Sequence, residues 1–172
     1  GTDLTLSIEG RPPLKVVPKK GAGEMMGPIP LWGEVAYAAI EDKTEGLIVF
    51  DGIMLGVGVP GTLPNPIEIV MKNGRAVEFR GGEEAKKLEK VVRENANADI
   101  IGEFALGTSE NEVVGSPSEK GLLGVLHLAL GDNWHCYPGG KNISVVHLDG
   151  SIRNATVEVD GKLIFDNGEL VI

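Results

Sequence analysis

Short runs of apolar residues, each closed by glycine, proline or a polar turn, recur along the chain. Apolar runs of about four to eight residues between such turns are typical of strands that are buried on at least one face. Residues 18–30 are rich in glycine and proline and are expected to form a loop. The pattern predicts strands over residues 2–9, 47–51, 66–71, 75–80, 100–106, 124–130, 143–148, 156–159 and 162–165, with a further mostly apolar segment over 33–40.

Two pairs of these strands are separated by short turns. Asn73-Gly74 lies between the runs 66–71 and 75–80, and Asp160-Gly161 separates the last two runs. Asn-Gly and Asp-Gly supply the positive φ angles that two-residue hairpin turns require. The sequence therefore predicts a β-hairpin at each position.

One segment, at about 83–97, follows a helical period instead. Apolar residues recur at Ala85, Leu88, Val91 and Val92, which is the spacing of one helix face. Acidic residues come early and basic residues later, as the helix dipole favours. We therefore expect an α+β fold, with residues 1–172 forming a single β-rich mixed-sheet domain that has one main helix.

The charge, the lengths of the apolar runs and the cysteine count limit which binding partners and which cellular compartment are expected. The 25 acidic and 16 basic residues give a net charge of −9, which disfavours a nucleic-acid partner, although any acidic surface has the same charge. No apolar run approaches the ~20 residues of a membrane span, so no membrane partner is expected. Cys136 is the single cysteine, so an intrachain disulfide cannot form, and a reducing, cytoplasmic compartment is expected.

The candidate chemistry begins at Val146-His147-Leu148-Asp149. Residues two apart on a strand share a face, so His147 and Asp149 are expected to point the same way, with Leu148 in the core. An imidazole beside a carboxylate on one face is either half of a metal site or a hydrogen-bonded pair. This motif alone leaves both readings open.

Three other polar residues interrupt apolar segments: Glu34, Glu103 and His127. A lone buried histidine is more often a core residue with a hydrogen-bond partner than a ligand. A buried carboxylate is costly unless it is paired or metal-bound. Taken together, Glu34, Glu103, His127, His147 and Asp149 match the nitrogen and oxygen ligands of a two-metal hydrolase, and we expect the site on strand ends.

These segments together resemble the M29 metallo-aminopeptidases, the group of aminopeptidases T and S that includes leucyl aminopeptidase-like proteins. The resemblance covers nearly the whole chain and consists of several short motifs in order. They are Gly33-Glu34-Val35, Gly102-Glu103-Phe104-Ala105-Leu106-Gly107-Thr108, Ser118-Glu119-Lys120, Gly124-Val125-Leu126-His127-Leu128-Ala129-Leu130-Gly131, Gly139-Gly140 and His147-Leu148-Asp149.

The resemblance implies an activity: removal of the N-terminal amino acid of a peptide by a metal-activated water. It implies two divalent ions (zinc, cobalt or manganese) bound by Glu34, Glu103, His127, His147 and Asp149. Glu103 and Tyr137 are then expected to be catalytic, and Trp134 and Ser144 to contact the substrate. It also implies a homodimer, and that the chain is the C-terminal catalytic part of a longer two-domain protein, inactive or slow as an isolated piece.

Two other readings use the same residues. A ring-cleaving dihydroxypyridine dioxygenase would hold one Fe(II) with His127, His147 and Asp149, and the presence of Glu34 and Glu103 argues against it. A non-catalytic metal-binding module would use the same ligands without turnover. The number of ions bound and an aminopeptidase assay distinguish these possibilities.

Overall fold

The computed structural model describes residues 1–16 and 33–171, so the loop expected at 18–30 lies outside the described residues. A five-stranded sheet runs through the middle of the molecule, and its neighbouring strands are antiparallel. In spatial order its strands are β2 (Leu14–Val16), β3 (Glu34–Ala38), β7 (Ile101–Gly107), β8 (Leu126–Gly131) and β9 (His147–Ile152).

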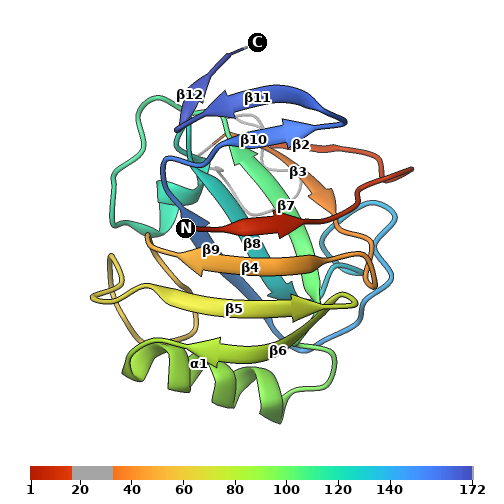
Figure 1. Ribbon diagram of the computed structural model, residues 1–172, viewed down its shortest axis with the longest axis vertical. Helices are drawn as coiled ribbons and strands as arrows, with labels where there is room; N and C mark the ends of the chain where they lie inside the picture. Colours follow the sequence, from red (N-terminus) through yellow and green to blue (C-terminus); the bar gives the residue numbers. More distant parts are fainter. Residues whose placement is uncertain (17–32, 172) are drawn as a thin grey trace.

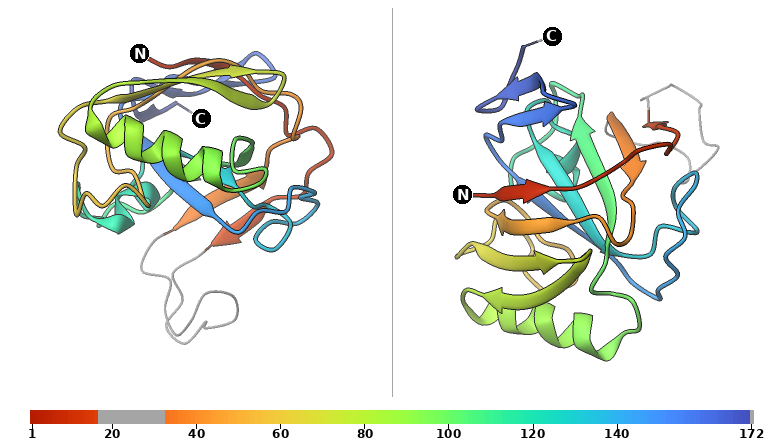
Figure 2. Two further views of the ribbon diagram at one scale, coloured as in Figure 1. Left: turned by 90° about the horizontal axis from the view of Figure 1, so that it is seen from below. Right: turned by 45° about the vertical axis from the view of Figure 1, so that its right-hand side comes forward.

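A second sheet crosses the first steeply, as Figures 1 and 2 show. A third, smaller sheet follows β9, and its neighbouring strands are likewise antiparallel. The second sheet consists of β1 (Asp3–Thr5), β4 (Glu45–Phe50), β5 (Ile67–Lys72) and β6 (Arg75–Arg80), and the third of β10 (Val157–Val159), β11 (Lys162–Asp166) and β12 (Glu169–Leu170).

The main core lies between the first two sheets. Alternate residues of β4 and β5 point inward, including Phe50 and Ile69, and meet Leu128, Leu130 and Leu148 from the facing sheet. Crossed sheets of this kind bury one face each. Strands β7 and β8 are nevertheless buried on both faces, and the face that points away from this core carries the buried polar residues Glu103 and His127.

The predicted helix forms α1 (Glu83–Glu94), which lies beside β6 (Figure 1) and buries Ala85, Leu88 and Val92. It ends before the predicted position because Asn95 adopts an extended conformation. The Asn95 side chain donates a hydrogen bond of 2.8 Å to the carbonyl of Val91, which satisfies part of the helix C-terminus. The described residues form one α-helix and several antiparallel strands, which confirms the predicted α+β class.

Both predicted hairpins are present, as β5–β6 and β10–β11. The strand predicted over 143–148 is wrong at residues 143–146, because β9 begins at His147. Residues 142–144 instead form a loop whose main chain is held by side chains: Asp132 accepts the N–H of Ser144, and Asn133 accepts that of Asn142. The short strands β2 and β12 were not predicted.

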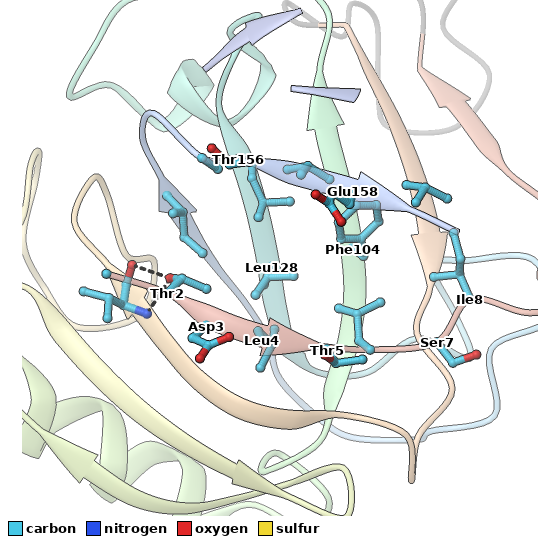
Figure 3. A pocket seen from close by; sticks show the side chains of 18 of the residues that line it. Thr2, Asp3, Leu4, Thr5, Ser7, Ile8, Phe104, Leu128, Thr156 and Glu158 are labelled. Carbon is cyan, nitrogen blue, oxygen red and sulfur yellow. Dashed lines mark hydrogen bonds between the residues drawn. The ribbon is translucent and has the colours of Figure 1, made fainter. Parts of the chain in front are cut away.

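A hollow of about 1160 Å³ lies between β1 and the segment that leads into β10 (Figure 3). Phe104 and Leu128 line it, and both belong to the apolar face of the five-stranded sheet. Each is adjacent in sequence to a predicted ligand on the opposite face. The hollow is therefore separate from the candidate chemistry. No helix among the described residues is long and apolar enough to span a membrane.

Candidate metal centre

Strand alternation places all five predicted ligands on one face of the five-stranded sheet. Glu103 pairs with Ala38 on β3 and with Ala129 on β8, and Asp149 is the next partner of Ala129 on β9. His127 lies opposite Ala105 in the same layer. The alanines between the ligands keep this face shallow, which leaves room for the longer polar side chains.

The ligands lie partly at strand ends and partly within strands. Glu34 and His147 are the first residues of β3 and β9, as the strand-end expectation requires. His127, Glu103 and Asp149 lie one or two residues further in. Because β3 and β9 run in opposite directions, Glu34 and His147 lie towards opposite ends of the sheet, and the centre extends across the middle of its face.

A β-bulge at Gly102 decides where Glu103 points. On β7 and β8, Ile101 faces Leu130 and Glu103 faces Ala129, so Gly102 is the extra residue. Bulges re-aim side chains in this way. Ile101 consequently packs in the apolar core, whereas Glu103 enters the polar cluster on the other face.

Three donor groups form an inner triad: Glu34, Glu103 and His127. The Nε2 atom of His127 lies 3.1 Å from Oε1 of Glu103 and 3.6 Å from Oε2 of Glu34. All three residues are buried. Their donor atoms lie within 4.8 Å of one another, which is a separation that one bound cation can span.

An outer triad uses the other oxygen of Glu103. The Nε2 atom of His147 lies 3.0 Å from Oε2 of Glu103 and 3.1 Å from Oδ1 of Asp149. His147 is partly exposed, whereas Asp149 is buried. Glu103 thus contacts one histidine with each carboxylate oxygen, which is the arrangement of a bridging ligand between two cations.

Both ligand histidines are anchored through the ring nitrogen that faces away from the cluster. The Nδ1 atom of His127 lies 3.0 Å from the carbonyl of Lys120, and that of His147 lies 2.8 Å from the carbonyl of Asp132. A carbonyl only accepts, so each Nδ1 carries the proton. Each Nε2 is then left to a cation or a second proton, as in histidine metal sites.

The metal-free cluster takes up protons where ions would bind. Burial alone would lower the pKa of His147, but Asp149 and Glu103 raise it to about 11. His127 is affected in the same direction, because Glu103 and Glu34 outweigh its burial and raise its pKa. Imidazolium is therefore the favoured form of His147 at neutral pH, and a bound cation would have to displace its proton.

The carboxylates of the cluster differ in their affinity for protons. Burial raises the pKa of Glu34, and nearby His127 only partly offsets this effect. Burial also acts on Glu103, but contacts with His127 and His147 hold the pKa of that carboxyl well below its usual value. Glu103 is accordingly the ionised carboxylate at the centre of the cluster.

One buried atom tests directly whether the residues fit a metal ion. Oδ1 of Asp149 has no hydrogen-bond partner within residues 1–16 and 33–171, and Nε2 of His147 lies 3.1 Å from it. A buried carboxylate oxygen without such a partner is costly. A cation at the outer triad would satisfy it, so the donor set fits a divalent metal.

Lys120 is a member of the cluster to which the sequence analysis assigned no role, although it belongs to the motif Ser118-Glu119-Lys120. It lies on the short 3₁₀ helix η1 (Pro117–Gly121), and its Nζ donates a 2.8 Å hydrogen bond to Oδ2 of Asp149. Burial would lower the pKa of this ammonium, but Asp149, Glu103 and Glu34 raise it. In the sequence Lys120 stands next to Gly121, and a lysine beside a turn residue gives no sign of whether its side chain is buried or exposed.

Tyr137 covers the ligand face from the loop between β8 and β9. Its ring packs on alanines of β3 and β7, and its centroid lies 5.7 Å from that of His147. Burial raises the pKa of the phenol, and a hydrogen bond with Glu103 raises it further. The hydroxyl therefore keeps its proton and remains a donor beside the cluster.

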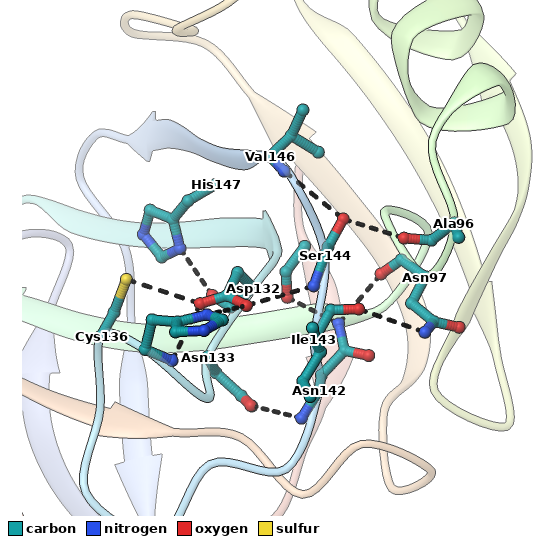
Figure 4. A network of polar contacts seen from close by, with 12 residues as sticks. Ala96, Asn97, Asp132, Asn133, Cys136, Asn142, Ile143, Ser144, Val146 and His147 are labelled. Carbon is teal, nitrogen blue, oxygen red and sulfur yellow. Dashed lines mark hydrogen bonds and ion pairs between the residues drawn. The ribbon is translucent and has the colours of Figure 1, made fainter.

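The remaining predicted site residues lie on the same loop but outside both triads. Trp134 is exposed, and the Ser144 hydroxyl donates to the carbonyl of Ala96. Asp132 organises this loop: its carboxylate accepts a hydrogen bond from Ser144, and its carbonyl contacts His147 (Figure 4). The same carboxylate also lies 2.9 Å from Nδ1 of His135. The sequence did not predict this double role of Asp132.

The whole chain, residues 1–172, matches the family described as thermophilic metalloprotease (M29). The chain belongs to the M29 metallopeptidase family. This confirms the resemblance inferred from the sequence motifs, and an M29 chain is expected to bind a divalent metal. No curated protein sequence matches it.

Two solved structures share the fold of this M29 chain. AmpT from Thermus thermophilus superposes with a TM-score of 0.69 at 19% identity, over 100% of this chain and 48% of that one. A 2,5-dihydroxypyridine dioxygenase from Pseudomonas putida KT2440 gives a TM-score of 0.71 at 21% identity, over 81% of this chain and 44% of that one. The chain thus matches less than half the length of either structure.

Proposed function

We propose that the chain is the catalytic, metal-binding part of an aminopeptidase that releases N-terminal amino acids from peptides. Membership of the M29 metallopeptidases supports the reaction class. The supporting observation in the structure is Glu103, whose two carboxylate oxygens lie 3.1 Å and 3.0 Å from the Nε2 atoms of two different histidines. Two divalent ions, zinc, cobalt or manganese, would share this carboxylate.

Five residues would hold the ions. Glu34, Glu103 and His127 would bind at the inner triad, and Glu103, His147 and Asp149 at the outer triad. The bound ions would polarise the scissile carbonyl and lower the pKa of a water molecule. Glu103 would hold the two ions at a fixed separation because it belongs to both triads.

Other side chains would act on the peptide. The Tyr137 hydroxyl keeps its proton beside Glu103, so it would donate a hydrogen bond to the oxygen on which charge develops. Trp134, exposed on the same loop, would contact the N-terminal side chain of the substrate. For Ser144, whose hydroxyl donates to Ala96, we propose a role in holding this loop rather than a direct substrate contact.

The assay is release of leucine from a short peptide with an N-terminal leucine, after metal removal and reloading with cobalt, manganese or zinc. We expect turnover only in the metal-loaded protein, none with the N-acetylated peptide, and none in Glu103→Gln. Glu94→Gln, a change at an exposed glutamate on α1, should behave as wild type. Peptide cleavage that persists after verified metal removal would contradict the proposal.

Two outcomes favour the other readings. Stoichiometric metal binding without turnover, in this chain and in any longer form, would favour a non-catalytic module. The dioxygenase reading needs His127, His147 and Asp149 around one Fe(II), whereas the donor groups found within residues 1–16 and 33–171 put the two histidines in different triads. Oxygen consumption with 2,5-dihydroxypyridine and Fe(II) would favour the dioxygenase reading.

A cytoplasmic location and a homodimer remain part of the proposal.

A further inference from the structure

Lys120 contacts both triads, once through its main chain and once through its side chain. Its carbonyl accepts the Nδ1 proton of His127 at 3.0 Å, and its Nζ donates to Oδ2 of Asp149 at 2.8 Å. The residue is 6% exposed. A buried ammonium at this position requires a specific reason, because a buried charge is costly unless it is paired.

Close packing of η1 against β7 fixes the position of Lys120. A Cβ atom on Gly107 would lie 2.2 Å from the carbonyl oxygen of Leu122 and 2.6 Å from the carbonyl carbon of Gly121. Only a glycine on β7 allows this approach. The main chain of η1 is therefore held against the strand that carries Glu103, so Lys120 has little freedom to withdraw.

Asp149 uses its two oxygens for different purposes. Oδ2 accepts from Lys120, whereas Oδ1 faces His147 and the outer triad without a hydrogen-bond partner in the part of the chain that the structure describes. An incoming cation at the outer triad would therefore find one oxygen available and the other engaged. A carboxylate without such a partner is free to bind a cation through both oxygens.

We propose that Lys120 is a positioning residue and the internal counter-ion of the metal centre: it neutralises Asp149 in the metal-free protein and keeps it a one-oxygen ligand when an ion binds. The inference rests on the proposed metal binding, though not on the peptidase reaction. Lys120 would therefore stabilise the fold of the metal-free protein and would lower the affinity of the outer triad for a cation.

This role predicts that substitution of Lys120 raises the affinity for metal, whereas loss of most residues around a metal site lowers it. A positive charge that shares a carboxylate with a divalent cation repels that cation, and the repulsion is strong in a buried site. Removing the ammonium should therefore strengthen metal binding, by about tenfold or more. Residues whose only role is to orient a ligand show the reverse, because losing them weakens metal binding about 10–100-fold.

The test is titration of the metal-free protein with Co²⁺, followed by visible absorption and calorimetry. Lys120→Met and Lys120→Gln both remove the charge, and Gln keeps a hydrogen-bond donor. Lys86→Met removes an exposed ammonium on α1, where the side chain is 72% exposed, and serves as the matched control. We expect tighter binding in both Lys120 variants, weaker visible absorption per bound ion in Lys120→Met as its coordination number rises, and no change in the control.

Thermal unfolding with and without metal supplies the second readout. Both Lys120 variants should melt well below wild type in chelator and recover most of the difference with Co²⁺. If Lys120→Met does not fold even with metal present, Lys120→Gln decides the affinity comparison. If wild type binds Co²⁺ but a folded Lys120 variant binds it more weakly or equally, this inference is overturned. Failure of wild type to bind any metal would overturn the proposed function instead.

Discussion

Ile101 and Glu103 are two residues apart on β7, yet their side chains lie on opposite faces of the sheet. A regular strand would put both on one face. The extra residue Gly102 resolves the conflict by forming a bulge, so that the strand supplies an apolar residue to the core and a carboxylate to the polar cluster.

The bulge should therefore be sensitive to the size of residue 102. A Cβ atom there would lie 2.6 Å from the carbonyl oxygen of Gly131, so Gly102→Ala should lower the unfolding free energy by about 1–3 kcal/mol. Because Glu103 follows directly, metal content should fall as well. Urea unfolding in chelator and elemental analysis measure the two effects. Gly61→Ala, where the nearest atom lies at 3.4 Å, is the control. Normal metal content in Gly102→Ala would show that the bulge is not needed to position Glu103 for metal binding.

Metal stoichiometry should depend on the ligands unequally. Glu103→Gln removes the carboxylate charge that both triads share and should lower the content at both positions, whereas His147→Ala should affect the outer triad more. Elemental analysis after dialysis measures this. Glu94→Gln and His135→Ala change exposed residues of the same types and should retain wild-type content. Full metal content in both ligand variants would show that the ions bind elsewhere.

Metal removal should destabilise the fold. An ion that binds only the folded state stabilises it by about 2.7 kcal/mol at a hundredfold excess over its dissociation constant. Chelation should lower the melting temperature of wild type and have little effect on Glu103→Gln. Differential scanning calorimetry on samples of verified metal content makes the comparison. An unchanged wild-type melting curve would mean that the ions contribute nothing to folding.

Stability in acid should reveal the ion pair between the buried Glu119 and the partly exposed Arg153. Burial alone would raise the pKa of Glu119, but hydrogen bonds from Arg153, Gly115 and Ser151 hold it below its usual 4.5. A lowered folded-state pKa gives stability that is present above pH 4.5 and lost as pH falls through the folded-state value. Glu119→Gln should therefore cost about 2–3 kcal/mol near neutral pH and progressively less in acid.

Chemical denaturation across this pH range, in chelator, measures the difference between Glu119→Gln and wild type. Glu78→Gln is the matched control, because Glu78 forms an exposed ion pair with Arg80 and should show no measurable change. A difference that stays constant down to pH 2 would show that the charge of Glu119 does not contribute.

Local patterns predicted much of this structure. The two-residue spacing of His147 and Asp149 correctly gave a shared face, and the Asn73-Gly74 turn gave the β5–β6 hairpin. A glutamate at position 103 within an apolar strand correctly indicated a buried, paired carboxylate. Each of these features depends on residues close in sequence.

Features that depend on distant residues were not predictable in the same way. The bulge at Gly102 is defined by pairing with β8, and the start of β9 is set by hydrogen bonds between Asp132 and the loop before it. Lys120 contacts Asp149, 29 positions away, only because η1 packs on Gly107. A lysine next to a turn gives no local sign of such burial.

The central claim is that two cations share Glu103, and anomalous scattering from crystals grown with zinc tests it most directly. The expected result is two peaks, one between Glu103 and His127 and one between Glu103 and His147, each within coordination distance of the Nε2 atom. Zinc bound in the crystal with no peak beside Glu103 would contradict the claim.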